Sequence, residues 1–319
     1  MTPPTDFAEF LAQAAGDPAL VSFGDPDAEF AALRDGAGLT WRSDLCAYRF
    51  DGADRTSFLH RLLTANVETL TVGHVRSTLL LDNKGRVQLV AALGATDEAL
   101  VMVGSRTAME SGVATLARYV LAADVKISLI EATVLELAGP ATEPTLAALD
   151  FAGPVAAPTL LRGEAAALIL ATTPIEVWKQ LIAAGVCPVG HGAVERMRIK
   201  DRRPAQGAEI TGAEFPQELL LTEAVDFDKG CYLGQETVAR IHYRGQVNRV
   251  LSAVYSDENV EVGDELFFAD RGVGRVTSSH CRPEHGSVAL ALLARASSAA
   301  GTCLTSASGA VVTVTEDVE

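Results

Sequence analysis

The sequence predicts an α+β protein followed by a small C-terminal β-barrel. Between residues 48 and 130, a strand, a helix, a β-hairpin, a second helix and a strand follow one another, which is the order of a split βαβ, ferredoxin-like unit. A fainter version of the same order runs from residue 134 to residue 184. Beyond residue 245, short strands alternate with turns at the spacing of a small barrel. We therefore expect an α+β domain of two subdomains over residues 1–244 and a β-barrel domain over residues 245–319.

The elements of the first subdomain each have a local signal. Asp54 can cap a helix that runs to Leu63, because apolar residues then share one of its faces. The stretch Asp82-Asn83-Lys84-Gly85 predicts the turn of a hairpin between strands at 76–81 and 86–93. The remaining predicted elements are strands at 48–50, 99–103 and 125–130 and a helix at 107–121.

The other parts of the chain give weaker signals. Pro174 suits the first position of a helix that runs to Ala184, since its fixed φ fits there. Residues 1–45 predict a lead-in with one or two short helices. The remaining predicted elements are strands at 134–138 and 166–172, helices at 145–149 and 192–199, a loop-rich segment at 205–227, and barrel strands at 249–255, 265–269, 274–278, 288–293 and 311–315.

Composition excludes several classes of protein. The 319 residues carry a net charge of -15, which argues against direct nucleic-acid binding. The N-terminus lacks the basic and apolar regions of a signal peptide, and no apolar run is long enough to span a bilayer. The cysteines are odd in number and scattered without a CxxC pair, which predicts a cytoplasmic protein with neither a disulfide framework nor a metal site. They are Cys46, Cys187, Cys231, Cys281 and Cys303.

One short segment, Asp228 to Arg240, concentrates residues that can carry chemistry. Cys231 follows Lys229 closely and precedes a predicted helix start, and both features favour a thiolate. Gly230 and Gly234 allow a close backbone approach or a positive φ. The alternative is a turn that holds a small buried cysteine, the commonest environment of a free thiol. The polar neighbours favour the functional interpretation.

Positive charge is concentrated around this segment. Residues 196–249 contain nine Lys or Arg and eight Asp or Glu, whereas the remainder of the chain is strongly acidic. One interpretation is an anion-binding mouth, for a polyglutamate tail or another carboxylated ligand. The other is a set of surface ion pairs, each worth little.

The stretch Lys-Gly-Cys-Tyr-x-Gly-Gln-Glu at residues 229–236 resembles the signature of the YgfZ family. These are folate-binding proteins related to the aminomethyltransferase of the glycine cleavage system. Residues 52–60 and 77–87 also resemble that superfamily. The resemblance implies three lobes around a cavity for tetrahydrofolate, two of them interlocked α+β units and the third a barrel.

The resemblance also assigns roles to residues. Cys231 would be the functional thiol with Lys229 beside it, in a motif loop that includes Gly230, Tyr232 and Gly234. The residues that would contact folate are Arg198, Asp201, Gln235, Glu236 and Arg240.

Two departures from the superfamily pattern concern the ligand site. Leu89 and Val90 stand where transferases carry an aspartate that positions the reactive folate nitrogen. Lys200 stands where the superfamily pattern has a glutamate that hydrogen-bonds to the pterin ring, and a lysine side chain has no hydrogen-bond acceptor. Arg202 replaces an expected glycine.

The function that the resemblance implies is that of a monomeric, cytoplasmic tetrahydrofolate-binding protein. It would support the assembly or repair of iron–sulfur clusters in client enzymes and so affect tRNA modification indirectly. One alternative is a folate-dependent aminomethyltransferase or demethylase, against which the missing carboxylate near Leu89 speaks. Another is a scaffold without a ligand that acts through protein contacts, which Lys200 favours.

Overall fold

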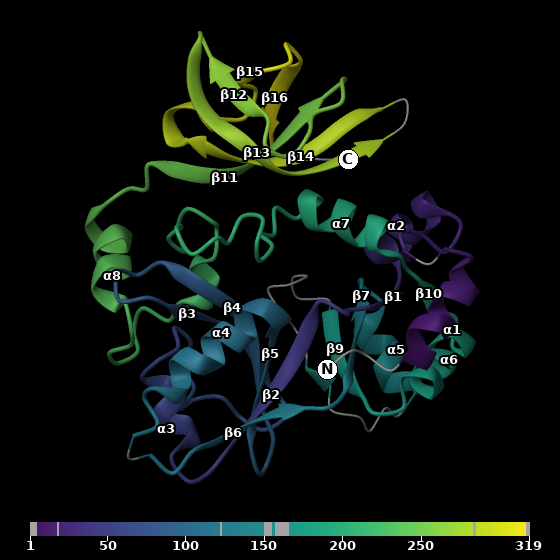
Figure 1. Cartoon of the computed structure of the whole chain (residues 1–319), viewed down its shortest axis with the longest axis vertical. Coiled ribbons are helices and arrows are strands. Elements are labelled where there is room, and N and C mark those ends of the chain that lie inside the picture. Colours follow the sequence, from purple (N-terminus) through teal and green to yellow (C-terminus); the bar gives the residue numbers. More distant parts are fainter. Residues whose placement is uncertain are drawn as a thin grey trace. The chain divides into compact units, whose positions relative to one another are not determined.

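The computed structural model describes residues 5–17, 19–121, 123–149, 155–156, 166–282 and 285–316. The chain forms two compact units. The first consists of residues 1–80 and 89–197, and the second of residues 81–88 and 198–319. Figure 1 labels the helices and strands of both units. Within the described ranges, no helix has the length and apolar character needed to cross a membrane.

The first sheet has the strand order β3-β4-β5-β2-β6, and β2 pairs antiparallel with both β5 and β6. Its core includes the fully buried Phe50, Leu89 and Leu93. Its elements are β2 (Leu45–Asp51), α3 (Arg55–His60), β3 (Val75–Leu81), β4 (Val87–Ala95), β5 (Leu100–Ser105), α4 (Arg106–Ala117) and β6 (Lys126–Ile130).

The second sheet has the strand order β10-β1-β7-β9-β8. Phe7 packs edge-on against Trp41 and Trp178 in its core, at centroid distances of 5.6 and 6.0 Å. Its strands are β1 (Gly38–Trp41), β7 (Thr133–Ala138), β8 (Val155–Ala156), β9 (Ala166–Ala171) and β10 (Cys187–Pro188). The helices in this part of the chain are α1 (Thr5–Ala15), α2 (Pro26–Asp35), α5 (Thr142–Ala148), α6 (Pro174–Ala183) and α7 (His191–Lys200).

The two sheets are interlocked because the chain crosses between them twice. It leaves the second sheet after β1 and enters the first at β2, then returns from β6 to β7. Leu45 and Val103 of the first sheet share one buried cluster with Val134 and Leu168 of the second. The predicted pair of interlocked α+β subdomains is therefore confirmed.

The C-terminal barrel is closed, with the strand order β11-β14-β13-β12-β15-β16. Its interior is apolar and includes Val254, Ala289 and Leu293. The strands are β11 (Arg249–Ser256), β12 (Glu265–Phe268), β13 (Arg271–Arg282), β14 (Gly286–Ala294), β15 (Cys303–Ser306) and β16 (Val311–Thr315). The sequence did not predict β15, and it placed β13 at 274–278 only. The first strand begins shortly after the domain boundary that we propose at residue 245.

One local prediction differs from the structure. Asp54 stands at the N-cap of α3, but its carboxylate accepts a hydrogen bond from the backbone N–H of Asp124 at 2.8 Å instead of capping the helix. The helix start predicted after Cys231 is confirmed, because α8 (Gln235–Arg244) begins there and continues to Gly245 before the chain becomes extended.

Candidate functional site

The motif loop between residues 228 and 234 begins with a backbone turn. The Asp226 carboxylate accepts hydrogen bonds from the N–H groups of Asp228 and Lys229, at 2.9 and 3.0 Å. An aspartate that holds the backbone two and three residues ahead is a standard turn device. The chain direction is therefore fixed where the loop starts, just before the exposed Gly230 and Cys231.

The far end of the loop is held by contact between two glycines. Gly234 has φ +79° and Gly85, at the tip of the β3–β4 hairpin, has φ +84°. A Cβ on Gly234 would lie 2.4 Å from the carbonyl oxygen of Asp82 and 3.0 Å from Cα of Gly85. Only glycine combines a positive φ with this approach. Positions 234 and 85 must therefore both be glycine for the hairpin tip to pack on the start of α8.

Between these two fixed ends, Cys231 is exposed, whereas Lys229 and Tyr232 are buried. Lys229 is 8% exposed, and its ammonium lies 5.2 Å from the centroid of the Tyr232 ring, within cation–π range. Tyr232 itself is 7% exposed. The interpretation of Cys231 as a buried structural thiol is wrong, since the packing of Lys229 and Tyr232 leaves its side chain at the surface.

The Tyr232 hydroxyl is buried, and it neither donates nor accepts a hydrogen bond among the described residues. Burial raises the pKa of this hydroxyl to about 12, and the charges of Asp226 and Tyr243 add to the effect. The unfolded chain therefore loses this proton near pH 10, before the folded chain does. Titration of Tyr232 therefore leaves the stability of the fold unchanged below pH 10 and lowers it as the pH rises from 10 toward 12.

Replacing Tyr232 by phenylalanine is expected to remove this loss of stability at alkaline pH, which amounts to roughly 2–3 kcal/mol. At pH 7 the variant should be more stable by about 1 kcal/mol, because a buried hydroxyl without a partner is removed. Urea unfolding between pH 7 and pH 11.5 measures both effects. The exposed Tyr119→Phe serves as the control and should retain the alkaline loss. An unchanged pH profile in Tyr232→Phe would contradict the burial argument.

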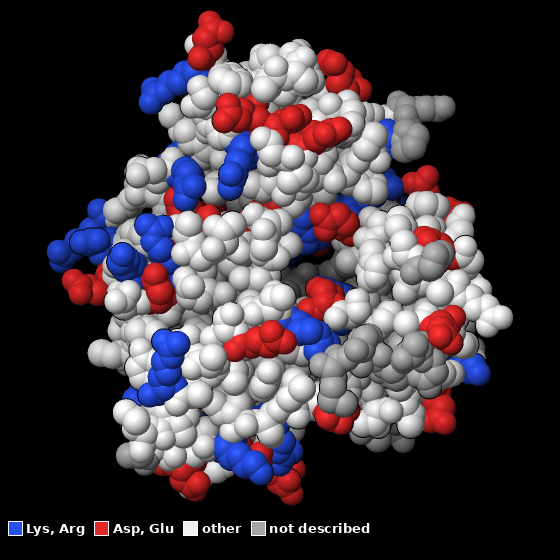
Figure 2. All heavy atoms as spheres, in the orientation of Figure 1, with Lys and Arg blue, Asp and Glu red and all other residues white. Residues whose placement is uncertain are grey.

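Three predicted ligand-contacting residues lie in α8. Gln235 is half-buried, and Glu236 and Arg240 are exposed. Within the described part of the chain, none of the three side chains is engaged in a hydrogen bond or ion pair, so all three are available to a ligand. Figure 2 shows Lys and Arg side chains gathered over the region of α8.

Aromatic side chains lie next to these α8 residues in the sequence. The His242 ring stacks on Phe227 with a centroid distance of 3.7 Å, and Tyr243 meets both rings edge-on. This cluster ties the C-terminal half of α8 to the segment that precedes the motif loop. The cluster therefore helps to hold the motif loop in place, in addition to the contact between Gly234 and Gly85.

Arg198 and Asp201 lie in a different segment, where α7 ends. The Arg198 guanidinium donates to Glu209 at 3.1 Å, to the carbonyl oxygen of Arg203 at 2.6 Å, and to Ser278 of β13. Glu209 also accepts from Ser278 at 2.6 Å and from the N–H of Ala205 at 2.8 Å. Arg198 thus serves a buried network that joins the loop after α7 to the barrel, whereas Asp201 is exposed. The sequence did not reveal Glu209, because its partners are distant along the chain.

Several of the cations predicted to form an anion-binding mouth are engaged in ion pairs. At least four of the nine have carboxylate partners: Arg196 with Asp27, Arg198 with Glu209, Arg203 with Glu223 and Arg249 with Glu218. These four therefore form ion pairs as the alternative interpretation expects, although the Arg198–Glu209 pair is buried rather than at the surface. Arg240 and Arg244 remain exposed on α8.

The two residues that the resemblance puts at the position of the transferase aspartate lie in the apolar core. Leu89 is 0% exposed and Val90 is 7% exposed, both on β4. Neither side chain can accept a proton or a hydrogen bond. Among the residues that the structure describes, no group of three or more His, Cys, Asp or Glu side chains could hold a metal ion.

Comparison with known proteins finds one matching family model and several relatives of low identity. A family model described as the GCVT N-terminal domain matches residues 7–156. A chloroplastic protein of Arabidopsis thaliana, whose name provisionally describes it as a transferase, is 27% identical over 86% of this chain and 69% of its own. The tRNA-modifying protein YgfZ of Vibrio vulnificus is 29% identical over 70% of this chain and 71% of its own. These similarities support the assignment of the chain to the YgfZ/glycine cleavage T-protein superfamily.

The fold agrees with that assignment. The crystal structure of aminomethyltransferase T of the glycine cleavage system from Bartonella henselae superposes with a TM-score of 0.84. The alignment covers 99% of this chain and 97% of that one, at 19% sequence identity. The two proteins therefore share the α+β body and the barrel.

Proposed function

We propose that this protein binds tetrahydrofolate and supports the assembly or repair of iron–sulfur clusters in client enzymes, with Cys231 as its functional thiol. The observation that carries the proposal is the exposure of Cys231 on a loop fixed at both ends. A working thiol must reach its partner, and a rigid support keeps it from folding back. We further propose that the protein acts as a monomer in the cytoplasm.

The connection to tRNA comes from the relatives. The Vibrio vulnificus relative is named a tRNA-modifying protein. This chain has a net charge of -15, which is unfavourable for binding RNA directly. An effect on tRNA modification would therefore be indirect, through clients that contain iron–sulfur clusters.

The folate part of the proposal rests on the superfamily, whose members are folate-dependent, and on groups that fit a pterin. A pterin ring offers both donors and acceptors, so its site needs both. Gln206 donates to the carbonyl oxygen of Gln88 at 3.1 Å, which orients its amide. The amide oxygen of Gln206 is then buried with no partner among the described residues. Asp201 adds an exposed carboxylate in the same segment.

Other residues of this chain would hold the rest of the molecule. Arg240 offers an exposed guanidinium to a carboxylate tail, and Gln235 offers an amide. Glu236 lies in the first turn of α8, where the helix dipole stabilises its negative charge. When bound, tetrahydrofolate would supply a one-carbon carrier.

An exposed thiol fits a role in iron–sulfur chemistry better than a role in aminomethyl transfer. Cysteine thiolates are the ordinary protein ligands of iron–sulfur clusters. A superfamily transferase would need a carboxylate near the reactive nitrogen, and the buried Leu89 and Val90 stand there instead. For this reason we prefer a cluster-support role to aminomethyl transfer or demethylation.

Replacing Cys231 by alanine is expected to abolish rescue of a bacterial strain that lacks its own YgfZ-like protein, while the protein remains folded. Cys231 is exposed, so the loss of its side chain should leave the thermal melting temperature unchanged within about 2 °C. The readouts are the activity of an iron–sulfur client enzyme and the level of its tRNA product. Cys281→Ala and Cys303→Ala, which remove other exposed thiols, should rescue fully. Equal rescue by Cys231→Ala would remove this thiol from the function.

A further inference from the structure

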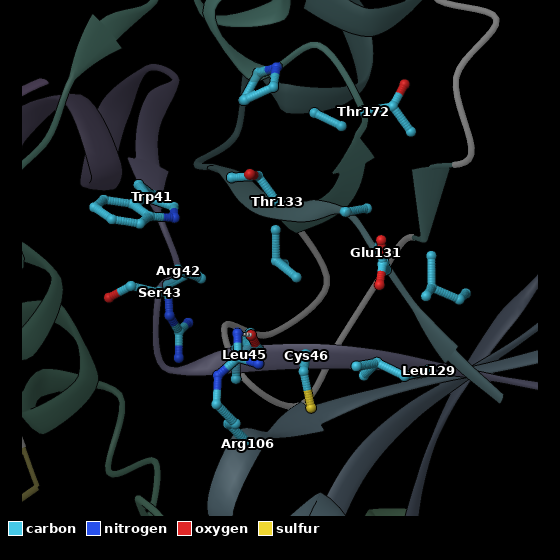
Figure 3. Close-up of a pocket in the computed structure, with 15 residues that line it drawn as sticks. Trp41, Arg42, Ser43, Leu45, Cys46, Arg106, Leu129, Glu131, Thr133 and Thr172 are labelled. Carbon is cyan, nitrogen blue, oxygen red and sulfur yellow. Dashed lines mark hydrogen bonds between the residues drawn. The ribbon is translucent and has the colours of Figure 1, made fainter. Parts of the chain in front are cut away.

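A second candidate site lies within the first compact unit, where the chain crosses between the two sheets. The cavity has a volume of about 270 Å³. It is walled by the β1–β2 connection, the β6–β7 connection, the end of β9 and the start of α4. None of the residues assigned above to the thiol or to folate lines it. Figure 3 shows its lining side chains.

The walls combine an apolar surface with a few polar and charged side chains. Trp41, Leu129 and Pro174 contribute apolar surface, and hydroxyl groups come from residues that include Ser43 and Thr133. Pockets that bind small molecules typically have this composition of mostly apolar walls with a few polar groups. The volume is near the lower end for such pockets, so only a small molecule would fit.

Of the two arginines in the wall, Arg42 is already neutralised. Its guanidinium donates twice to Asp44, at 2.8 Å each, and once to Glu136 at 2.6 Å. The carboxylates of Asp44 and Glu136 therefore neutralise the positive charge of Arg42. We do not expect it to attract a further anion.

Arg106 differs, because most of its donors are unused. In the part of the chain that the structure describes, its guanidinium makes one hydrogen bond, from Nη2 to the carbonyl oxygen of Leu45 at 3.0 Å. An arginine has five N–H donors in a planar fork that matches a carboxylate. Figure 3 shows Arg106 beside Leu45 and Cys46. Cys46 is 4% exposed; burial raises the pKa of its thiol, and the nearby charge of Arg106 opposes that rise.

We propose that this cavity binds a small carboxylate with an apolar body, held at the carboxylate by Arg106. Leu129, Trp41 and Pro174 enclose the apolar part. Two sources share this chemistry, a short branched-chain acid and the corresponding α-amino acid. Glu131, which is exposed and also lines the cavity, favours the amino acid because its carboxylate can pair with an ammonium group.

Calorimetric titration of the full chain with 4-methylpentanoate, with leucine and with the neutral 4-methylpentan-1-ol tests the proposal. We expect saturable binding of at least one of the two carboxylates and none of the alcohol. Stronger binding of leucine identifies the amino acid as the source, and stronger binding of 4-methylpentanoate identifies the simple acid. No saturable heat for either carboxylate at millimolar concentration, or equal binding of the alcohol, would overturn the proposal.

Arg106→Met should weaken carboxylate binding about tenfold to a hundredfold, because a charge-assisted hydrogen bond is lost. Arg118→Met, at the other end of α4, removes an exposed arginine and should bind normally. Should Arg106→Met fail to fold, Leu129→Trp fills the cavity from a position that is 39% exposed, and it should also abolish binding. Unchanged affinity in either folded variant contradicts the assignment.

A second readout follows the cavity wall directly. Cys46 lines the cavity, whereas the half-buried Cys187 does not. The bound carboxylate should slow alkylation of Cys46 by N-ethylmaleimide several-fold and leave Cys187 unaffected, as measured by peptide mass spectrometry. Equal rates at Cys46 with and without a saturating ligand would place the ligand elsewhere.

Discussion

Replacing Arg42 by methionine is expected to lower the free energy of unfolding by about 3–5 kcal/mol. The Glu136 side chain is fully buried, and Arg42 lies 2.6 Å from it. Burial lowers the pKa of Arg42, but the attraction of Glu136 and the bonds to Asp44 outweigh this and hold it above its ordinary value. Removing the guanidinium takes a counter-ion at 2.6 Å away from a carboxylate inside the protein. Urea unfolding at pH 7 measures the loss.

Two variants show whether the buried charge is the cause. The double variant Arg42→Met/Glu136→Leu removes both charges and should recover most of the lost stability, since an apolar pair can replace a buried ion pair. Arg34→Met breaks an ion pair in which both side chains are more than half exposed and should have no measurable effect. A double variant as unstable as Arg42→Met would contradict this explanation.

Replacing Gly234 by alanine is expected to destabilise the protein by about 2–4 kcal/mol and to displace the motif loop. The strain of a left-handed residue contributes roughly 1–2 kcal/mol. The added Cβ would lie 2.4 Å from the carbonyl oxygen of Asp82, so the hairpin tip must also move, which typically costs a further ~1–3 kcal/mol. We expect a lower urea midpoint together with reduced rescue, because Cys231 loses its support.

Gly207→Ala separates these two causes. Gly207 has φ +90°, and no atom lies within 4 Å of the point that its Cβ would occupy, so only the conformational strain applies. This control should cost about 1 kcal/mol and should rescue normally. If Gly234→Ala matched Gly207→Ala in both assays, contact with the hairpin tip would not hold the loop.

Elements with strong local signals could be predicted from the sequence. Pro174 marked the first residue of α6, and the turn at 82–85 lies between β3 and β4 as expected. In the candidate site, the motif itself predicted that Cys231 is exposed, because polar residues and glycines surround it. These features depend on residues close together in the chain.

Features that depend on distant residues could not be predicted. Glu136 is a single carboxylate in an otherwise apolar strand, and its partner Arg42 is 94 positions away. The contact of Gly234 with the hairpin tip and the cavity beside Arg106 likewise arise only when separate segments meet. Strand β15 was missed because Cys303-Leu-Thr-Ser is short and polar, and its pairing with β12 and β16 closes the barrel.

The most direct test of the proposed function is calorimetric titration of the wild-type protein with tetrahydrofolate under anaerobic conditions. If the protein has kept the folate site of the superfamily, it should bind tetrahydrofolate saturably at a single site. The absence of any saturable heat at millimolar tetrahydrofolate would contradict the proposal and leave a protein that acts through contacts alone.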